Sequence, residues 1–179
     1  MNLVKYSVKP VFPKFDELVE LCTSIVEIQS KNKQYANQIM LQTNAEYNDW
    51  FYGVGTIENY ADLLPTRTFN KIQPALAGSI VEEYFNWLEI PVFRSRLMMM
   101  DPKSTYSIHS DHEFRFHLPL ISNKNCYMIF PTVGFAAQMY HFAADGATYW
   151  ANTRQPHTAA NFDLVKQRLH LVMCVDKVF

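Results

Sequence analysis

The chain has 179 residues, of which 49% are hydrophobic and 18% charged, and its formal net charge is −1. This composition argues against a disordered chain and supplies enough apolar residues for one substantial core. A near-neutral chain lacks the basic field on which nucleic-acid binding normally depends, so no nucleic-acid partner is predicted.

The three cysteines, Cys22, Cys126 and Cys174, are odd in number and show no CxxC spacing. Neither a disulfide framework nor a zinc ribbon is therefore expected. The N-terminus has no apolar segment typical of a signal peptide, and no apolar run approaches the roughly 18 residues that a membrane span needs. We expect a cytoplasmic protein without a membrane partner. The sequence carries no signal for an oligomeric state.

The first half of the chain, residues 1–90, predicts a supporting region of helices and short strands. Its predicted strands are residues 2–8 and 37–44, and its predicted helices are Phe15–Gln29 and residues 75–89. Pro91 ends the second helix. The aromatic stretch Tyr47–Tyr60 has two interpretations, packing in the core or lining a substrate pocket.

From Val92 onward, short alternating segments separated by turn residues predict β-strands. These segments are residues 92–100, 105–111, 113–120, 125–130, 136–142, 147–150, 158–162 and 167–175. The dipeptide Asp145-Gly146 predicts a tight hairpin between residues 136–142 and 147–150. Many short strands after two helices are typical of a jelly roll braced by helices. We therefore predict a mainly β, single-domain protein over residues 1–179, with residues 91–176 as the jelly-roll core.

The stretch Tyr106–Leu120, YSIHSDHEFRFHLPL, holds three of the six histidines of the chain. Residues two apart on a strand point to the same side, so His109 and Asp111 can aim an imidazole and a carboxylate at one point. Further along, Arg115 and His117 alternate with Phe114, Phe116 and Leu118. This alternation predicts a strand inside a barrel that holds a ligand, with one apolar and one polar face.

A third metal ligand is expected downstream, and His157 is the best candidate. Two histidines and one carboxylate on one side of a metal form the arrangement of non-haem iron(II) oxygenases. Arg168 and His170 share one face of the last predicted strand. The rigid, planar guanidinium of Arg168 suits a carboxylate, to which it can donate two hydrogen bonds. Whether His170 lines the pocket stays open. His112 has the opposite parity to His109, and His141 lies in an aromatic strand, so neither is expected to bind the metal.

The segments HSD, FRFHLPL, the distal PH and QRLHLV, in this order, resemble the 2-oxoglutarate- and iron(II)-dependent oxygenases of the aspartyl/asparaginyl β-hydroxylase-like group. The resemblance covers about residues 91–176 and implies a cupin-like double-stranded β-helix. It implies that His109, Asp111 and His157 bind Fe(II) and that Arg168 binds the distal carboxylate of 2-oxoglutarate. Arg115 and His117 match a pair that lines the co-substrate site.

The same resemblance implies a hydroxylase that uses O2 and releases succinate and CO2. Vertebrate aspartyl/asparaginyl enzymes have a glycine at the position of Asp111, whereas the bacterial and phage relatives have an aspartate there. The run ANTRQP replaces an acidic segment before His157, and Met98 replaces a serine that contacts the co-substrate. These departures affect the expected substrate more than the chemistry.

Three substrate classes stay open: a residue of a peptide, a free amino acid, and a small metabolite or modified base. The resemblance favours an amino-acid-type substrate, such as an aspartyl or asparaginyl residue. Arg154 and Asn161 flank His157 and are weaker candidates for substrate contacts. Two other function classes stay open, a cupin-like binding protein without turnover and a zinc hydrolase with an activated water. The hydrolase gives Arg168 no role.

Overall fold

The computed structural model describes residues 3–5, 7–31, 37–44, 49–54, 66–132 and 136–179. The chain divides into two compact units: the helical unit, Phe12–Met98, and the β unit, Met1–Val11 with Met99–Phe179. Much of the aromatic stretch, residues 47–48 and 55–60, lies outside the described residues. Its predicted role at a substrate pocket is therefore not tested.

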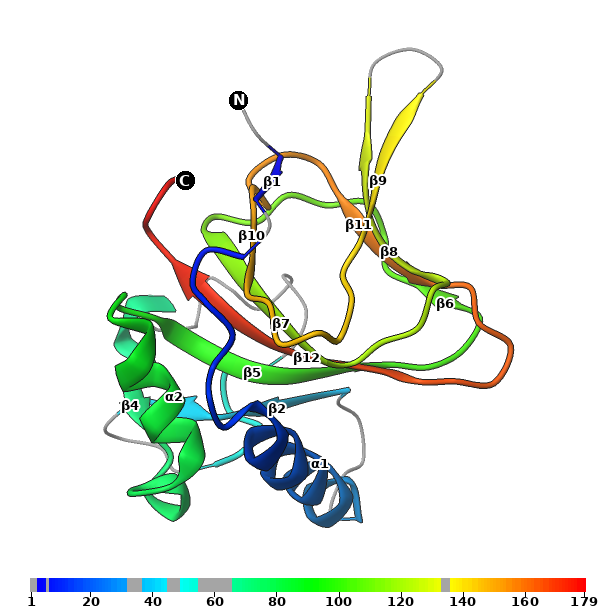
Figure 1. Cartoon of the computed structure of the whole chain (residues 1–179). Helices are drawn as coiled ribbons and strands as arrows, with labels where there is room; N and C mark the ends of the chain where they lie inside the picture. The colour runs from blue at the N-terminus through cyan, green and yellow to red at the C-terminus, as the bar shows by residue number, and fades with distance from the viewer. Residues whose placement is uncertain (1–2, 6, 32–36, 45–48, 55–65, 133–135) are drawn as a thin grey trace. The chain divides into compact units, whose positions relative to one another are not determined.

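The helical unit contains both α-helices of the described chain (Figure 1). Its elements are α1 (Phe15–Lys31), β2 (Gln38–Met40), β3 (Gln42–Thr43), the 3-10 turns Thr66–Thr68 and Pro74–Leu76, β4 (Lys71–Ile72), α2 (Ile80–Leu88) and most of β5 (Phe93–Met100). Strand β2 pairs with β5, and β3 pairs with β4, both antiparallel. The predicted strand at residues 37–44 is thus present, interrupted at Leu41.

The first predicted helix is confirmed. In α1, Leu18, Cys22 and Ile25 are buried at helical spacing, and Asp16 and Glu17 lie in the first turn, where acidic groups favour the helix N-terminus. The predicted start of the second helix at residue 75 is wrong. The Ser79 hydroxyl accepts a hydrogen bond from the Val81 N–H at 3.3 Å and caps α2 there. Residues Pro74–Leu76 form a separate 3-10 turn.

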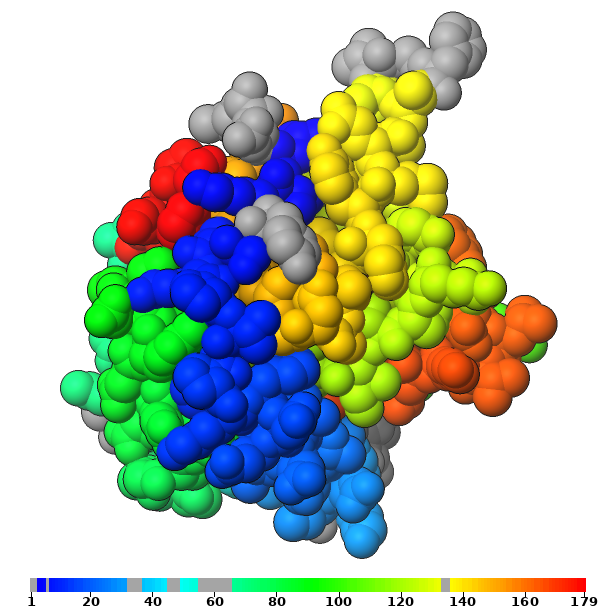
Figure 2. All heavy atoms as spheres, viewed as in Figure 1, coloured from blue at the N-terminus to red at the C-terminus, as the bar shows by residue number. Residues whose placement is uncertain are grey.

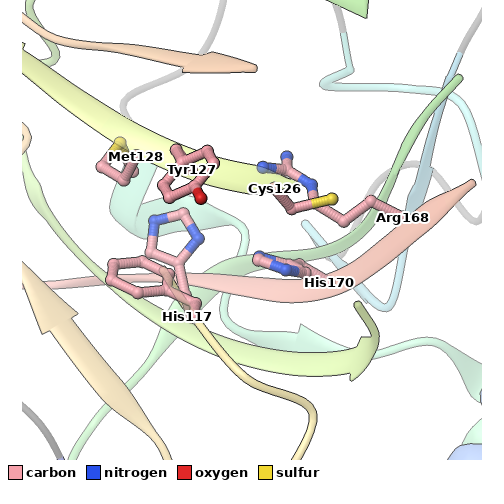
Figure 3. A pocket seen from close by; sticks show the side chains of 7 residues that line it. His117, Cys126, Tyr127, Met128, Arg168 and His170 are labelled. Atoms are coloured by element: carbon pink, nitrogen blue, oxygen red, sulfur yellow. The ribbon is translucent and has the colours of Figure 1, made fainter. Parts of the chain in front are cut away.

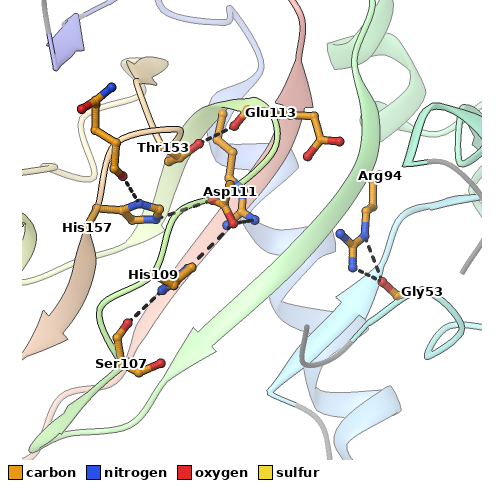
Figure 4. Close-up of polar contacts among 10 residues, drawn as sticks. Gly53, Arg94, Ser107, His109, Asp111, Glu113, Thr153 and His157 are labelled. Carbon is orange, nitrogen blue, oxygen red and sulfur yellow. Dashed lines mark hydrogen bonds and ion pairs between the residues drawn. The ribbon is translucent and has the colours of Figure 1, made fainter. Parts of the chain in front are cut away.

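Gly53 closes a turn of the helical unit under tight steric limits. Its φ is +90°, and an added Cβ would lie 2.6 Å from Cε1 of Phe69, which is buried. Its carbonyl also accepts two hydrogen bonds from the Arg94 guanidinium, at 3.0 and 2.8 Å (Figure 4). A side chain at this position therefore meets both left-handed backbone strain and a clash with a packed ring.

We expect Gly53→Ala to destabilise the protein by about 2–5 kcal/mol, the sum of a left-handed penalty of about 1–2 and an overpacking cost of about 1–3. Gly78 is the matched control, because its φ is +72° but no heavy atom of the described residues lies within 4 Å of an added Cβ. Gly78→Ala should lose only the left-handed backbone penalty, about 1–2 kcal/mol of unfolding free energy. Urea unfolding of both variants measures the difference, and equal losses would contradict the steric account.

The β unit consists of strands in two sheets. One sheet has the order β1 (Val4–Lys5), β10 (Tyr149–Ala151), β7 (Phe114–Ile121), β12 (Arg168–Val175), and the other has the order β6 (Ser104–Thr105), β11 (Thr158–Asn161), β8 (Cys126–Pro131), β9 (Ala137–His141). Neighbouring strands of these orders pair antiparallel. From β6 onward the chain passes repeatedly between the sheets, which makes a jelly roll. The mainly β prediction is confirmed.

The predicted hairpin at Asp145-Gly146 is wrong. Strand β9 pairs with β8, whereas β10 pairs with β7 and β1 in the other sheet. The dipeptide does turn the chain: Gly146 has φ +80°, and the Asp145 carboxylate accepts a hydrogen bond from the Ala147 N–H at 3.0 Å. This turn carries the chain from one sheet to the other. The prediction failed because local turn chemistry does not specify which strands pair afterwards.

The core of the β unit lies between its two sheets. All eight residues of β12 are buried, as are Phe114–Leu120 of β7, so the predicted strand with an apolar and a polar face lies inside the jelly roll. One apolar cluster contains Met128, Phe130, Phe142, Ala147, Tyr149 and Ala151. Strand β9 is instead mostly exposed at a sheet edge, and Figure 2 shows its surface in yellow. Within the described residues, no helix has the length and apolar character that crossing a bilayer requires.

Candidate active site

The segment before β7 is not the strand that its sequence predicted. Of the predicted strand at residues 105–111, only Thr105 is in a strand, the two-residue β6 (Ser104–Thr105). His109 instead makes an isolated bridge to His157, with N–H to carbonyl distances of 3.0 and 2.8 Å. The Asp111 N–H donates to the Thr153 carbonyl at 2.8 Å. Backbone hydrogen bonds with the distal segment therefore hold this run in place of a continuous strand ladder.

These contacts bring three potential metal ligands together. The ligand atoms of His109, Asp111 and His157 all lie within 4.8 Å of one another. Nε2 of His157 is 3.5 Å from Oδ2 of Asp111, and Nε2 of His109 is 3.8 Å from Oδ1 (Figure 4). The three side chains predicted as one cluster therefore converge, although they come from separate loops of the β unit.

Both imidazoles are held in the orientation that metal binding needs. Nδ1 of His109 lies 2.8 Å from the Ser107 carbonyl, and Nδ1 of His157 lies 2.9 Å from the Gln155 carbonyl. A carbonyl only accepts, so each Nδ1 carries the proton and each Nε2 has a free lone pair facing the cluster. Burial lowers the pKa of His157 below 6.5, although Asp111 opposes the shift, which favours the neutral ligand form.

The two oxygens of the Asp111 carboxylate differ in their hydrogen bonding. Oδ1 accepts a hydrogen bond from Nη2 of Arg115 at 2.5 Å. Oδ2 is buried and has no hydrogen-bond partner within the described part of the chain. A buried carboxylate oxygen without a partner is costly unless a cation binds it. Two imidazole nitrogens and this oxygen are the donor set of the two-histidine, one-carboxylate iron site, so the residues present fit Fe(II).

A small cavity of the β unit lies between the two sheets (Figure 3). It is lined by His117, Cys126, Tyr127, Met128, Phe142, Arg168 and His170. Arg168 is 4% exposed, and no carboxylate of the described residues forms an ion pair with it. Burial lowers the pKa of Arg168 from 12.5, but a guanidinium stays charged. The cavity thus carries a buried positive charge that a bound anion would neutralise.

Strand β8 connects the cavity with the metal cluster. Cys126, Met128 and Phe130 are buried and alternate along it, so their side chains share one face. Cys126 and Met128 line the cavity, and the Phe130 ring lies 5.9 Å from the His157 ring. The arginine cavity and the metal cluster therefore lie along one inner face of the jelly roll.

The other predicted residues fall into two groups. His117 lines the cavity with Arg168, and so does His170, whose role the sequence left open. Arg115 is not among the cavity residues, because its guanidinium binds Asp111 instead. Asn161 is buried, and its amide donates to the carbonyls of Met100, Asp101 and Lys166.

The remaining histidines and Arg154 lie outside the cluster. His112 is exposed, and His141 faces the Cys126 carbonyl through Nδ1 at 2.9 Å. The guanidinium of Arg154 lies over the Phe114 ring, 5.4 Å from its centroid. None of the three belongs to the group of potential metal ligands.

Sequence reasoning missed the residues that act through their backbone. The carbonyls of Ser107, Thr153 and Gln155 hold the ligands, and backbone contacts of this kind leave no trace in residue type. The cavity residues of β8 did carry a signal. Cys126 and Met128 repeat with the strand period of two, and this alternation marks the inner face.

No family model matches the chain, and no curated protein matches it. Solved structures do. A non-haem monooxygenase, ThoJ, in complex with nickel is 14% identical, with 97% of this chain and 73% of that chain covered and a TM-score of 0.55. A prolyl-4-hydroxylase from Pseudomonas putida is 11% identical, with 99% and 95% covered and a TM-score of 0.52. AviO1 from Streptomyces viridochromogenes is 9% identical, with 96% and 89% covered and a TM-score of 0.51. The chain therefore has the jelly-roll fold of these proteins.

Proposed function

We propose that the protein is an Fe(II)- and 2-oxoglutarate-dependent dioxygenase that hydroxylates an unactivated C–H bond. One observation carries the proposal: a convergent His109–Asp111–His157 cluster lies along the same inner face as a cavity with a buried, unneutralised Arg168. A metal site alone suits many functions. A metal site combined with a cationic cavity suits a reaction in which a carboxylate co-substrate binds beside the metal.

Each residue has a defined part in this proposal. His109, Asp111 and His157 hold Fe(II), which supplies the oxygen chemistry when bound. Arg115 fixes Asp111 through its hydrogen bond to Oδ1 and leaves Oδ2 for the metal. Arg168 binds the distal carboxylate of 2-oxoglutarate, and His117 lines the same site. The buried rings of Phe130 and Phe142 exclude water from this face.

The overall reaction balances as substrate, 2-oxoglutarate and O2 giving hydroxylated substrate, succinate and CO2. One oxygen atom enters the substrate and the other enters succinate. We propose an amino-acid-type substrate, free or within a peptide, as the resemblance to the aspartyl/asparaginyl β-hydroxylase-like group implies. We also propose that residues 1–179 act as one catalytic domain in the cytoplasm, where the buried thiols of Cys22, Cys126 and Cys174 stay reduced.

Succinate formation tests the proposal. Purified protein with Fe(II), ascorbate, 2-oxoglutarate and air should release succinate, and pools of amino acids or peptides that contain a substrate should increase the rate. The increase should depend on iron and disappear in His157→Ala. Iron binding without succinate under any condition would favour the cupin-like binding protein over the oxygenase. Hydrolysis of an ester or amide by the zinc-loaded protein would favour the hydrolase.

A further inference from the structure

His170 is a buried polar group that the protein itself does not satisfy. It is 2% exposed, and neither ring nitrogen has a hydrogen-bond partner among the described residues. Its ring contacts are with His117, at 5.9 Å between centroids, and with Phe142, at 6.3 Å. An imidazole left in this state costs free energy, and native structures retain such groups mostly where a ligand or water completes them.

The position of His170 indicates which ligand this is. His170 and Arg168 are two residues apart on β12 and line the same cavity, with Arg168 beside Cys126 in Figure 3. Residues at this spacing on a strand are about 6.6 Å apart along the backbone and face the same side. Two side chains this close can donate to the two oxygens of a single carboxylate.

The charges around His170 are all positive or neutral. Arg168 shares its strand, His117 faces it from β7, and His141 of β9 acts on it from farther away. The other cavity residues that can ionise are Cys126 and Tyr127 of β8. No carboxylate belongs to the cavity lining in the described part of the β unit. Burial, followed by Arg168, holds the pKa of His170 well below 6.5, so His170 is neutral before an anion binds.

We propose that His170 joins Arg168 in binding the distal carboxylate of 2-oxoglutarate and takes up a proton as this carboxylate enters. The proposal rests on the proposed function and adds proton coupling to it. A carboxylate beside His170 favours the charged imidazole, because opposite charges at short range stabilise each other. The proton comes from solvent, moves to a ring nitrogen of His170, and returns to solvent when the anion leaves.

The sign of the pH dependence follows from this coupling. The pKa of His170 is low in the ligand-free protein and raised in the complex. At pH values between these two pKa values, the complex binds one more proton than the ligand-free protein. Affinity for 2-oxoglutarate should therefore increase as pH falls through this interval, and should be independent of pH outside it. A neutral His170 that only donates its N–H would give the same contact without any pH dependence.

Calorimetry of 2-oxoglutarate binding to anaerobic, Fe(II)-loaded protein separates these cases. Titrations at pH 7 in two buffers of different ionisation enthalpy give the number of protons exchanged. The wild type should take up between about 0.5 and 1 proton. His170→Gln, which keeps an N–H donor but cannot titrate there, should take up essentially none. His170→Leu, which removes the donor as well, should bind about tenfold or more weakly.

His141→Gln is the matched control, since His141 is exposed and outside the cavity lining, and it should behave as the wild type. The metal ligands are the same in all these proteins, so the difference between variants isolates His170. Undiminished proton uptake in His170→Gln would overturn the proposal and assign the proton to another group, such as His117. A wild type that binds iron but no 2-oxoglutarate would instead overturn the proposed function itself.

Discussion

Replacing Asp111 with alanine should weaken Fe(II) binding by at least about a hundredfold and abolish succinate formation. Asp111 is the acidic member of the potential metal cluster, and its Oδ2 has no hydrogen-bond partner among the residues that the structure describes. Loss of an outer-shell partner of a metal ligand already costs about 10- to 100-fold in affinity, so loss of a direct ligand should cost more. Anaerobic Fe(II) titration of the purified variant measures the effect.

Folding has to be controlled in this experiment, because Asp111→Ala also leaves the Arg115 guanidinium without its carboxylate. Thermal unfolding shows whether the variant still folds. A second pair avoids the problem: His109→Ala removes a predicted ligand, whereas His112→Ala removes an exposed histidine three residues away that lies outside the cluster. We expect iron binding to fall in the first and to persist in the second. Wild-type affinity in both Asp111→Ala and His109→Ala would mean that iron binds elsewhere.

Arg168→Met should weaken 2-oxoglutarate binding by about 30- to 4,000-fold, the range that corresponds to a loss of about 2–5 kcal/mol when one partner of a buried charge pair is removed. Fe(II) affinity should stay unchanged, because Arg168 is not a member of the metal cluster. The stability of the ligand-free protein should stay the same or increase. A buried guanidinium without a carboxylate partner costs free energy in the empty protein, and methionine fills similar space without that cost.

Arg154→Met provides the matched control for Arg168→Met. Arg154 is exposed, lies over the Phe114 ring and is not among the cavity residues. This variant should bind 2-oxoglutarate as the wild type does. Tight co-substrate binding by Arg168→Met would show that the cavity is not the site of the distal carboxylate, and a large drop in its stability would show that the guanidinium has a structural role instead.

Much of the fold and of the candidate site could be predicted from the sequence. The helical spacing of Leu18, Cys22 and Ile25 predicted α1, and the period-two alternation predicted the strands β7 and β12. These patterns are local consequences of burial, so they are visible in the sequence. The spacing of His109 and Asp111 correctly indicated that they converge.

The predicted strand over residues 105–111 does not explain that convergence. His109 and Asp111 do not lie on a regular strand; contacts with the His157 and Thr153 backbone hold them. The placement of Arg115 beside Asp111 depends on the same loop, so strand parity did not predict it. The Asp145-Gly146 turn likewise gave no information on sheet membership. The His109–His157 bridge and the sheet membership of β9 and β10 are long-range pairings, which local sequence does not encode.

Anaerobic absorption spectroscopy tests the central claim most directly, because it needs no knowledge of the substrate. Iron(II) chelated by the keto and carboxylate oxygens of 2-oxoglutarate gives a visible metal-to-ligand charge-transfer band. We predict a band that appears only when both Fe(II) and 2-oxoglutarate are present, that saturates at equimolar ratios to protein, and that needs much more 2-oxoglutarate in Arg168→Met. Protein that binds Fe(II) yet shows no such band at saturating 2-oxoglutarate would contradict the account.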